Sequence, residues 1–222
     1  MMKSDFKSCN GVAQSDDRKD NPVLKRTESQ LLASAGPAET DSRLFLVKLL
    51  PCSEDGDGHG CRIIDYIGTN CKEVVIPKQI NGMPVTSIGE GAFEGHTELT
   101  SVSVLGNVLK VGDSAFKGCT NLTKVVFSNA LEVIGESAFQ DCTKLVDVGL
   151  DRACLRKIGD RAFSGCTSLT RVAFLGCVAE VGNYTFSGCS SLTNISFPKS
   201  VKIIGRGAFA ACISLTDLWI PP

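Results

Sequence analysis

The chain has 222 residues, of which 43% are hydrophobic, and its formal net charge is −1. A nearly neutral chain carries no broad field that would draw nucleic acid or an anionic membrane, so the composition excludes both as main partners. No run of about 18 apolar residues occurs, so no membrane-spanning helix is predicted.

Residues 1–42 are rich in Ser, Asp, Lys and Asn and show no hydrophobic periodicity, which predicts a disordered polar tail. The beginning of this tail lacks the apolar segment of a signal peptide and is too acidic for a transit peptide. We therefore expect a cytoplasmic protein. The alternative is a fragment of a cell-surface protein whose leader and anchor lie outside this chain.

Residues 43–70 are predicted to form a β-hairpin. The apolar runs 44–50 and 61–66 have strand character, and a loop rich in Gly and Asp separates them. Because repeats follow, the hairpin is expected to cap the apolar face of the first repeat. The loop contains Asp55, Asp57 and His59, but Tyr66 stands where a calcium loop needs its glutamate. A plain loop is therefore favoured over a metal site.

A recurring phrase fills residues 71–222 and predicts six to seven repeats, the last of them incomplete. The phrase reads Ile/Val-Gly, two variable residues, Ala/Thr-Phe and, three residues later, a position that is usually Cys. The phenylalanines lie 23 or 24 residues apart, at Phe93, Phe116, Phe139, Phe163, Phe186 and Phe209. So regular a period is typical of a solenoid, in which each unit buries its apolar face against its neighbours.

Two apolar pairs in each repeat predict two walls of the solenoid. The first pair alternates with exposed positions, as in Val125 and Phe127, which is typical of a strand with one face inward. The second pair, such as Leu131 and Ile134, lines the opposite wall. So short a unit leaves room for only a single helical turn at Ala-Phe. Successive strands must then stack in parallel, about 4.8 Å apart.

Glycine recurs at two positions of the repeat. The first position follows the second apolar pair and never varies, which we attribute to a backbone angle closed to other residues. It is occupied by Gly89, Gly112, Gly135, Gly159, Gly182 and Gly205. The second position ends the helical turn, as glycine commonly does. It is occupied by Gly95, Gly118, Gly165 and Gly188, and by Asp141 and Ala211 in two units.

Five of the eleven cysteines lie three residues after a repeat phenylalanine, at Cys119, Cys142, Cys166, Cys189 and Cys212. Because free cysteine is small and readily buried, we expect reduced core thiols, and all eleven cysteines should react once the chain is unfolded. Cys154 and Cys177 lie off this position and are the candidates for reactive thiols. His96 takes the place of the cysteine in the first repeat, where an end-of-core role is favoured over that of a base.

The repeat resembles the BspA-like class of leucine-rich repeat, with its Leu-Thr-x-Val-x-Ile-Pro strand and Ile-Gly-x-x-Ala-Phe-x-Gly-Cys turn. Residues 187–198, which read Ser-Gly-Cys-Ser-Ser-Leu-Thr-Asn-Ile-Ser-Phe-Pro, carry the resemblance most clearly. It implies an α/β fold: a right-handed leucine-rich-repeat solenoid with a parallel β-sheet and short helical turns, used for protein binding. Members of this class are often surface proteins of bacteria and protists, and some are adhesins.

Strand residues between the inward pairs face outward and form the largest regular surface. One row on this surface is charged with mixed signs, and the other is small and partly apolar. The candidate protein-binding residues are Lys124, Val126, Asp147, Arg171, Ala173, Asn194 and Trp219. A solvated face without a partner is the alternative. Trp219 is either an interface anchor or a residue that a following unit would cover.

These features predict a non-catalytic scaffold that binds a protein partner on the exposed face of its sheet. The alternative is a BspA-like surface adhesin that binds host or matrix proteins. An enzyme ranks third, because only two histidines are present and no Cys-x-x-Cys pair occurs. No catalytic residue, cofactor or metal is predicted. The uncapped last repeat would allow end-to-end association between copies.

Overall fold

A computed structural model describes residues 40–50, 60–150, 153, 155–174 and 177–220. The predicted tail lies almost entirely outside these ranges, as does the loop that contains Asp55, Asp57 and His59. Within them a 3-10 helix, η1 (Ser42–Leu44), precedes the strands. These are β1 (Phe45–Leu50), β2 (Gly60–Tyr66), β3 (Glu73–Ile76), β4 (Gln79–Ile80), β5 (Met83–Ile88), β6 (Ser101–Val104), β7 (Lys110–Val111), β8 (Lys124–Val126), β9 (Val133–Ile134), β10 (Asp147–Gly149), β11 (Lys157–Ile158), β12 (Arg171–Ala173), β13 (Glu180–Val181), β14 (Asn194–Ser196), β15 (Ile203–Ile204) and β16 (Asp217–Trp219).

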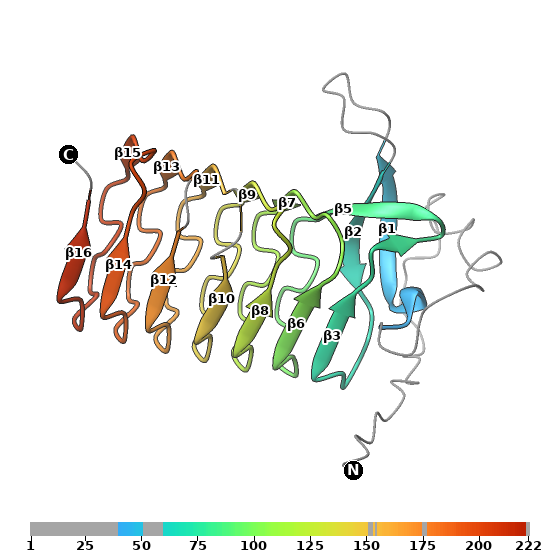
Figure 1. The fold of residues 1–222 in the computed structure, drawn as a ribbon. Helices are drawn as coiled ribbons and strands as arrows, with labels where there is room; N and C mark the ends of the chain where they lie inside the picture. The colour runs from blue at the N-terminus through green and yellow to red at the C-terminus, as the bar shows by residue number, and fades with distance from the viewer. Residues whose placement is uncertain (1–39, 51–59, 151–152, 154, 175–176, 221–222) are drawn as a thin grey trace, which may run out of the picture.

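The chain winds as a β-solenoid, and each coil contributes one strand to a front sheet and one to a rear sheet (Figure 1). The front sheet consists of β3, β6, β8, β10, β12, β14 and β16. The rear sheet consists of β2, β5, β7, β9, β11, β13 and β15. Neighbouring strands that pair within these sheets are parallel, so that Lys124 lies beside both Ser101 and Asp147. The predicted solenoid of stacked parallel strands is confirmed.

The Ala-Phe segments form hydrogen-bonded turns rather than the helical turns that the sequence predicts. In a representative coil the Lys117 N–H donates to the Ser114 carbonyl at 3.0 Å. The Phe116 N–H instead leaves its coil and donates to the Ala138 carbonyl of the next coil at 2.7 Å. Because alternate N–H groups bond between coils, the turn cannot continue as a helix. The described residues accordingly contain no α-helix.

The repeat phenylalanines form one continuous stack through the core. The ring centroids of neighbours from Phe93 to Phe186 lie 4.8–5.4 Å apart, at interplanar angles of 2–12°. These rings are fully buried. Phe209 extends the stack at 5.8 Å and is itself partly exposed. Each ring therefore removes the faces of its neighbours from water, which is the main favourable term in folding.

The N-terminal hairpin extends this stack, because β2 continues the rear sheet and Tyr66 adds a ring beyond Phe93. β1 pairs antiparallel with β2, and β2 pairs in parallel with β5 of the first repeat. The Tyr66 ring lies 5.1 Å from that of Phe93, and the Phe45 ring lies 5.4 Å from that of Tyr66. The Tyr66 N–H donates to the Ala92 carbonyl at 2.9 Å, as the Phe93 N–H donates to Ala115. These contacts continue the ring stack and its hydrogen bonds beyond the first repeat, and the capping role of the hairpin stays a prediction.

Thr40, two residues before η1, covers the outer edge of β3 at the same end of the solenoid. The Thr40 N–H donates to the Val75 carbonyl at 3.2 Å, and the Val75 N–H donates to Thr40 Oγ1 at 2.6 Å. Both backbone groups of Val75 therefore have partners. Unpaired strand edges recruit further strands, so this contact protects the start of the front sheet.

The far end of the described solenoid is open. Leu218 occupies an inward position of β16 but is 43% exposed, and Ile204, at the inward position of β15, is only partly buried. Phe209 and Leu215 are only partly buried there. End-to-end association through this last coil, which such residues would allow, stays a prediction.

The invariant glycines are required by the close approach of successive coils and not by their backbone angle. None of Gly89, Gly112, Gly135, Gly159, Gly182 and Gly205 has a positive φ. A Cβ on Gly159 would lie 2.6 Å from the carbonyl carbon of Gly135 and 2.6 Å from the nitrogen of Glu136. The explanation by backbone angle is therefore wrong. Glycine marks the point where one backbone lies directly against the next.

Positive φ angles occur at two other positions of the coil. One of them ends the turn, as predicted, with Gly118 at 70° and Asp141 at 59°. The other lies two residues after the invariant glycine, at a position for which no positive φ is predicted from the sequence. It is occupied by Gly91, Ser114, Ser137, Arg161, Tyr184 and Gly207. Glycine at the first and last of these sites is the signal that could have revealed it.

The hydrogen-bonded ladder of the front sheet is interrupted between β10 and β12. β3, β6, β8 and β10 form one ladder and β12, β14 and β16 another, and no pairing joins the two within the described residues. The interruption coincides with the single 24-residue spacing, from Phe139 to Phe163. The rear sheet continues across it, because Lys157 pairs with both Val133 and Glu180. The rear sheet therefore keeps its register in the coil that is one residue longer.

Replacing Phe139 by Ala removes one ring from the middle of the stack. We expect the free energy of unfolding to fall by about 3–5 kcal/mol, because buried Phe truncations leave a cavity that neighbours fill poorly. Urea denaturation measures the change, with the exposed Val126→Ala as a control that should lose less than about 0.5 kcal/mol. A loss below about 1 kcal/mol for Phe139→Ala would show that the rings do not form a spine.

Two glycine substitutions separate the steric constraint between coils from the constraint on φ. Gly118→Ala places a Cβ 3.9 Å from its nearest neighbour at φ +70°, so it should cost about 1–2 kcal/mol of backbone strain. Gly159→Ala should cost more, because its Cβ meets backbone and the two coils must move apart. Equal losses for the two variants in urea denaturation would refute the steric explanation.

Candidate functional site

The candidate residues lie on the outward face of the front sheet, and their neighbours in sequence belong to the core. In β8 the buried Val125 separates the exposed Lys124 and Val126. In β10 the exposed Asp147 precedes the buried Val148. The other candidates occupy equivalent outward positions in β12, β14 and β16, namely Arg171, Ala173, Asn194 and Trp219.

Charges on this face are spaced singly and alternate in sign. Lys124 Nζ lies 4.0 Å from Asp147 Oδ2, and both side chains are more than half exposed. So exposed a pair contributes about 0–1 kcal/mol to stability. Arg171 comes next along the row, but its strand belongs to the second ladder. The face that was predicted to be contiguous therefore consists of two hydrogen-bonded parts.

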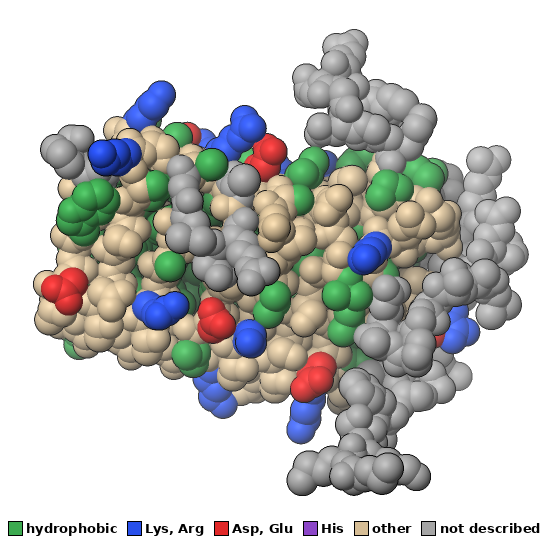
Figure 2. Space-filling model, in the orientation of Figure 1, with side chains coloured by type: hydrophobic (Ala, Val, Ile, Leu, Met, Phe, Trp, Pro, Cys, Tyr) green, Lys and Arg blue, Asp and Glu red, His purple; other side chains and the backbone are tan. Residues whose placement is uncertain are grey.

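Figure 2 shows this side of the molecule, on which isolated Lys, Arg, Asp and Glu side chains stand among small and uncharged ones. Val126 is 39% exposed, and its neighbours across the ladder are Ser103 and Gly149. Small residues beside an exposed apolar one leave a low, flat surface. Such a surface suits contact with another folded protein more than enclosure of a small molecule.

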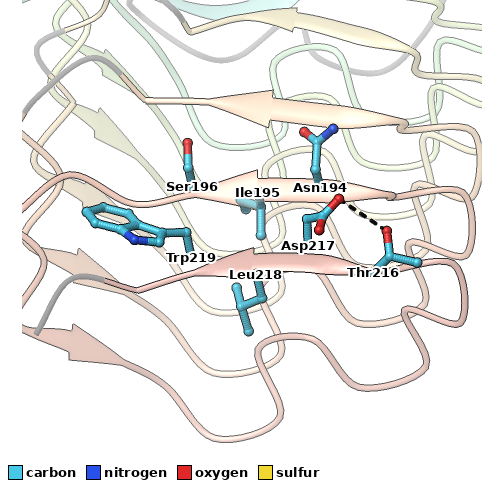
Figure 3. Close-up of a pocket in the computed structure, with 7 residues that line it drawn as sticks. All are labelled: Asn194, Ile195, Ser196, Thr216, Asp217, Leu218 and Trp219. Atoms are coloured by element: carbon cyan, nitrogen blue, oxygen red, sulfur yellow. Dashed lines mark hydrogen bonds between the residues drawn. The ribbon is translucent and has the colours of Figure 1, made fainter.

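A shallow hollow lies at the C-terminal end of the face, over β14 and β16 (Figure 3). Trp219 and Asp217 project from β16 to the same side as Asn194 and Ser196 of β14. Trp219 is 51% exposed, and the Asp217 carboxylate accepts a hydrogen bond from the Thr216 hydroxyl at 3.4 Å. Asp217 is not among the predicted binding residues, although the period of two places it in the same row as Asn194.

The repeat cysteines are free, as the repeat position predicts, and each of them is hydrogen-bonded. Those of the inner coils are fully buried, and Cys212 in the last coil is partly exposed. Each thiol lies 3.0–3.2 Å from the carbonyl oxygen of the phenylalanine one coil earlier. Burial raises the pKa of Cys119 and of Cys189 to about 12. The reactive thiolate is therefore scarcely populated at neutral pH.

Two cysteines outside the repeat position differ from these. Cys177 is exposed and free, whereas Cys154 lies outside the described residues. Cys71, two residues before β3, is buried and disulfide-bonded, and none of the other described cysteines is its partner. The expectation that all eleven thiols are free is therefore wrong. Cys71 matches no spacing motif, so the sequence carries no local signal for this bond.

His96 lies at the start of the core, as its place in the repeat predicts. Its ring centroid is 5.3 Å from that of Tyr66, and its Nδ1 lies 2.7 Å from Glu98 Oε1. In the part of the chain that the structure describes, no three His, Cys, Asp or Glu side chains group closely enough to hold a metal ion. Nor does that part include a helix with the length and apolar character needed to cross a membrane.

A comparison with known protein families identifies the type of repeat. A model of the BspA type leucine rich repeat region matches residues 65–155 and 151–222, in six copies. The two matches together cover well over half of the chain. The chain belongs to the BspA-type leucine-rich repeat family. Its parallel solenoid and its recurring Gly, Phe and Cys positions are the features expected of such a repeat.

Solved structures of leucine-rich repeat proteins share the fold. A leucine-rich repeat protein of T. pallidum is 33% identical over 82% of this chain and 81% of its own, with a TM-score of 0.73. A leucine rich cell surface protein from Faecalibacterium prausnitzii is 27% identical, with a TM-score of 0.62. That match covers 84% of this chain but only 55% of the other. No curated protein sequence matches the chain significantly.

Thiol labelling at pH 8 should divide the cysteines of this BspA-type protein into three groups. The exposed Cys177 should react within minutes, and the buried Cys142 and Cys166 only as the protein unfolds, because burial raises their thiol pKa. Cys71 should react only after unfolding and reduction. Peptide mass spectrometry reads each site. Labelling of Cys71 without reductant, or a disulfide between repeat cysteines, would contradict this assignment.

Proposed function

We propose that this BspA-type protein is a non-catalytic scaffold that binds a protein partner on the outward face of its front sheet. The observation that carries the proposal is the contrast between the two sides of each front strand. Inward residues such as Val125 and Val148 are buried and apolar in successive coils. Outward residues such as Lys124, Asp147 and Arg171 differ from coil to coil and are exposed. Leucine-rich repeats are in general protein-interaction scaffolds, which supports the same conclusion.

The dimensions of the face fit a protein partner. At about 4.8 Å per strand, the front strands from β3 to β16 extend over roughly 30 Å. A stable complex buries about 800 Å² on each partner, and a sheet of this length can supply that area. Catalysis is not proposed, because burial raises the pKa of the repeat thiols and leaves them poor nucleophiles.

Charge reversal on the face tests the proposal. The double variant Lys124→Glu and Arg171→Glu should weaken affinity capture of the main partner at least tenfold, which corresponds to about 1.4 kcal/mol. The melting temperature should change by no more than a few degrees, since both side chains are exposed. Quantitative mass spectrometry of the captured proteins measures the effect.

A matched control reverses two exposed charges on the rear side, with Lys110→Glu and Lys202→Glu. It changes the net charge equally and should leave capture unaltered. A chain that starts at Thr40, which keeps the contact with Val75, should also retain capture. If removal of residues 1–39 abolishes capture while the front-face variant binds normally, the tail is the recognition element and the proposal fails.

A surface adhesin is the second candidate, and two observations favour it. Disulfides such as that of Cys71 persist in oxidising compartments and are uncommon in the cytosol. The similar Faecalibacterium prausnitzii chain is described as a cell surface protein. The competing proposal is the cytoplasmic location expected from the N-terminal composition. Thiol trapping in intact cells decides between them, because only an oxidised Cys71 supports the surface location.

A further inference from the structure

The hollow over β14 and β16 is the one place on the front face where an aromatic ring and a carboxylate lie together in the described part of the chain. Its lining consists of Asn194, Ile195, Ser196, Thr216, Asp217, Leu218 and Trp219. The lining includes no Lys, Arg or His. Each side chain that points into it from the front therefore offers either an oxygen acceptor or the face of the indole (Figure 3).

Asp217 differs from the other acidic residue in the middle of the face. Asp147 has Lys124 as its ion-pair partner at 4.0 Å, whereas the hydrogen-bond partner of Asp217 is the neutral Thr216 hydroxyl at 3.4 Å. Arg171 is the nearest cation of the row, but its strand, β12, is separated from β16 by β14. The Asp217 charge is thus uncompensated by its lining and stands open to solvent.

The spacing of Asp217 and Trp219 suits a single cation. Residues two apart on a strand point to the same side and lie about 6.8 Å apart along it. A cation over an indole face is attracted by the ring quadrupole, and an adjacent carboxylate adds a charge-assisted hydrogen bond. In Figure 3 the Asp217 carboxylate is turned toward Thr216 and away from the indole, so a guanidinium that stacks on the Trp219 ring binds Asp217 once this exposed carboxylate rotates toward the ring. Asn194 and Ser196 on the neighbouring strand add further acceptors.

We propose that Trp219 and Asp217 form a subsite for an arginine or lysine side chain of the protein partner, with arginine the better fit. This inference rests on the proposed function, and it adds the chemistry of the partner at one end of the face. A basic side chain is favoured over a sugar because the subsite carries an uncompensated negative charge. A neutral sugar would leave that charge without a counterion.

The chain contains a single tryptophan, so the indole N–H signal of Trp219 in a nitrogen-15 NMR spectrum reports on this subsite alone. The probe is a flexible acetylated and amidated hexapeptide with one arginine among Gly and Ser residues. The matched control peptide carries neutral citrulline instead. The arginine peptide should shift the indole signal in a saturable way and bind at least fivefold more tightly than the citrulline peptide. Its affinity should fall as salt is added.

Two matched variants test which carboxylate of the front face binds the arginine. Asp217→Asn should weaken binding of the arginine peptide at least fivefold, whereas Asp147→Asn, on the same face, should leave it unchanged. Both residues are exposed, so the melting temperature should stay within a few degrees. Equal shifts with arginine and citrulline peptides would overturn the proposal. So would a shift caused by a neutral oligosaccharide but not by the arginine peptide, which would make the hollow a sugar site.

Failure of this subsite is distinguishable from failure of the proposed function. If the arginine peptide does not bind but Lys124→Glu with Arg171→Glu still weakens capture, the face binds a partner that does not use the subsite. If the peptide binds normally but the double variant has no effect on capture, the subsite stands and the wider face is not the partner's site.

Discussion

Close stacking of nearly identical coils is the constraint on which the rest of this structure depends. At Gly159 a Cβ would lie 2.6 Å from the backbone of the preceding coil, so only glycine permits the approach. The same approach brings successive phenylalanine rings to 4.8–5.8 Å and each thiol to 3.0–3.2 Å from a phenylalanine carbonyl. Glycine, phenylalanine and cysteine recur together because all three serve the contact between one coil and the next.

That constraint also separates the residues that fold the chain from the residues that are free to bind. Inward positions of the front strands must fill the space between coils, so Val125 and Val148 cannot change without cost. Outward positions meet only solvent and their neighbours on the same face. The sequence there can vary without loss of stability, and this freedom lets Lys124, Arg171 and Trp219 form a recognition surface.

At the start of the solenoid the stack continues past the first repeat. Tyr66 supplies both a ring and an N–H donor to the first coil, and Thr40 occupies the edge of β3. The interruption between β10 and β12 shows what the stack tolerates. The front ladder is interrupted in the one coil that is a residue longer, while the rear sheet keeps its register. The phenylalanine stack also passes this point unbroken, with 5.2 Å between Phe139 and Phe163.

The sequence by itself determined the period, the two walls, the buried phenylalanines and thiols, and the outward row in which the candidate residues lie. These follow from the sequence because each depends on contacts that every repeat makes in the same way. The same residue types therefore recur at the same positions in six repeats. The tertiary structure alone decided the reason for the invariant glycines, the break after β10 and the bond of Cys71. It also decided that Asp217 and Trp219 share a hollow without a cation. Each of these depends on contacts between particular atoms of two coils. The period of the sequence does not specify those contacts.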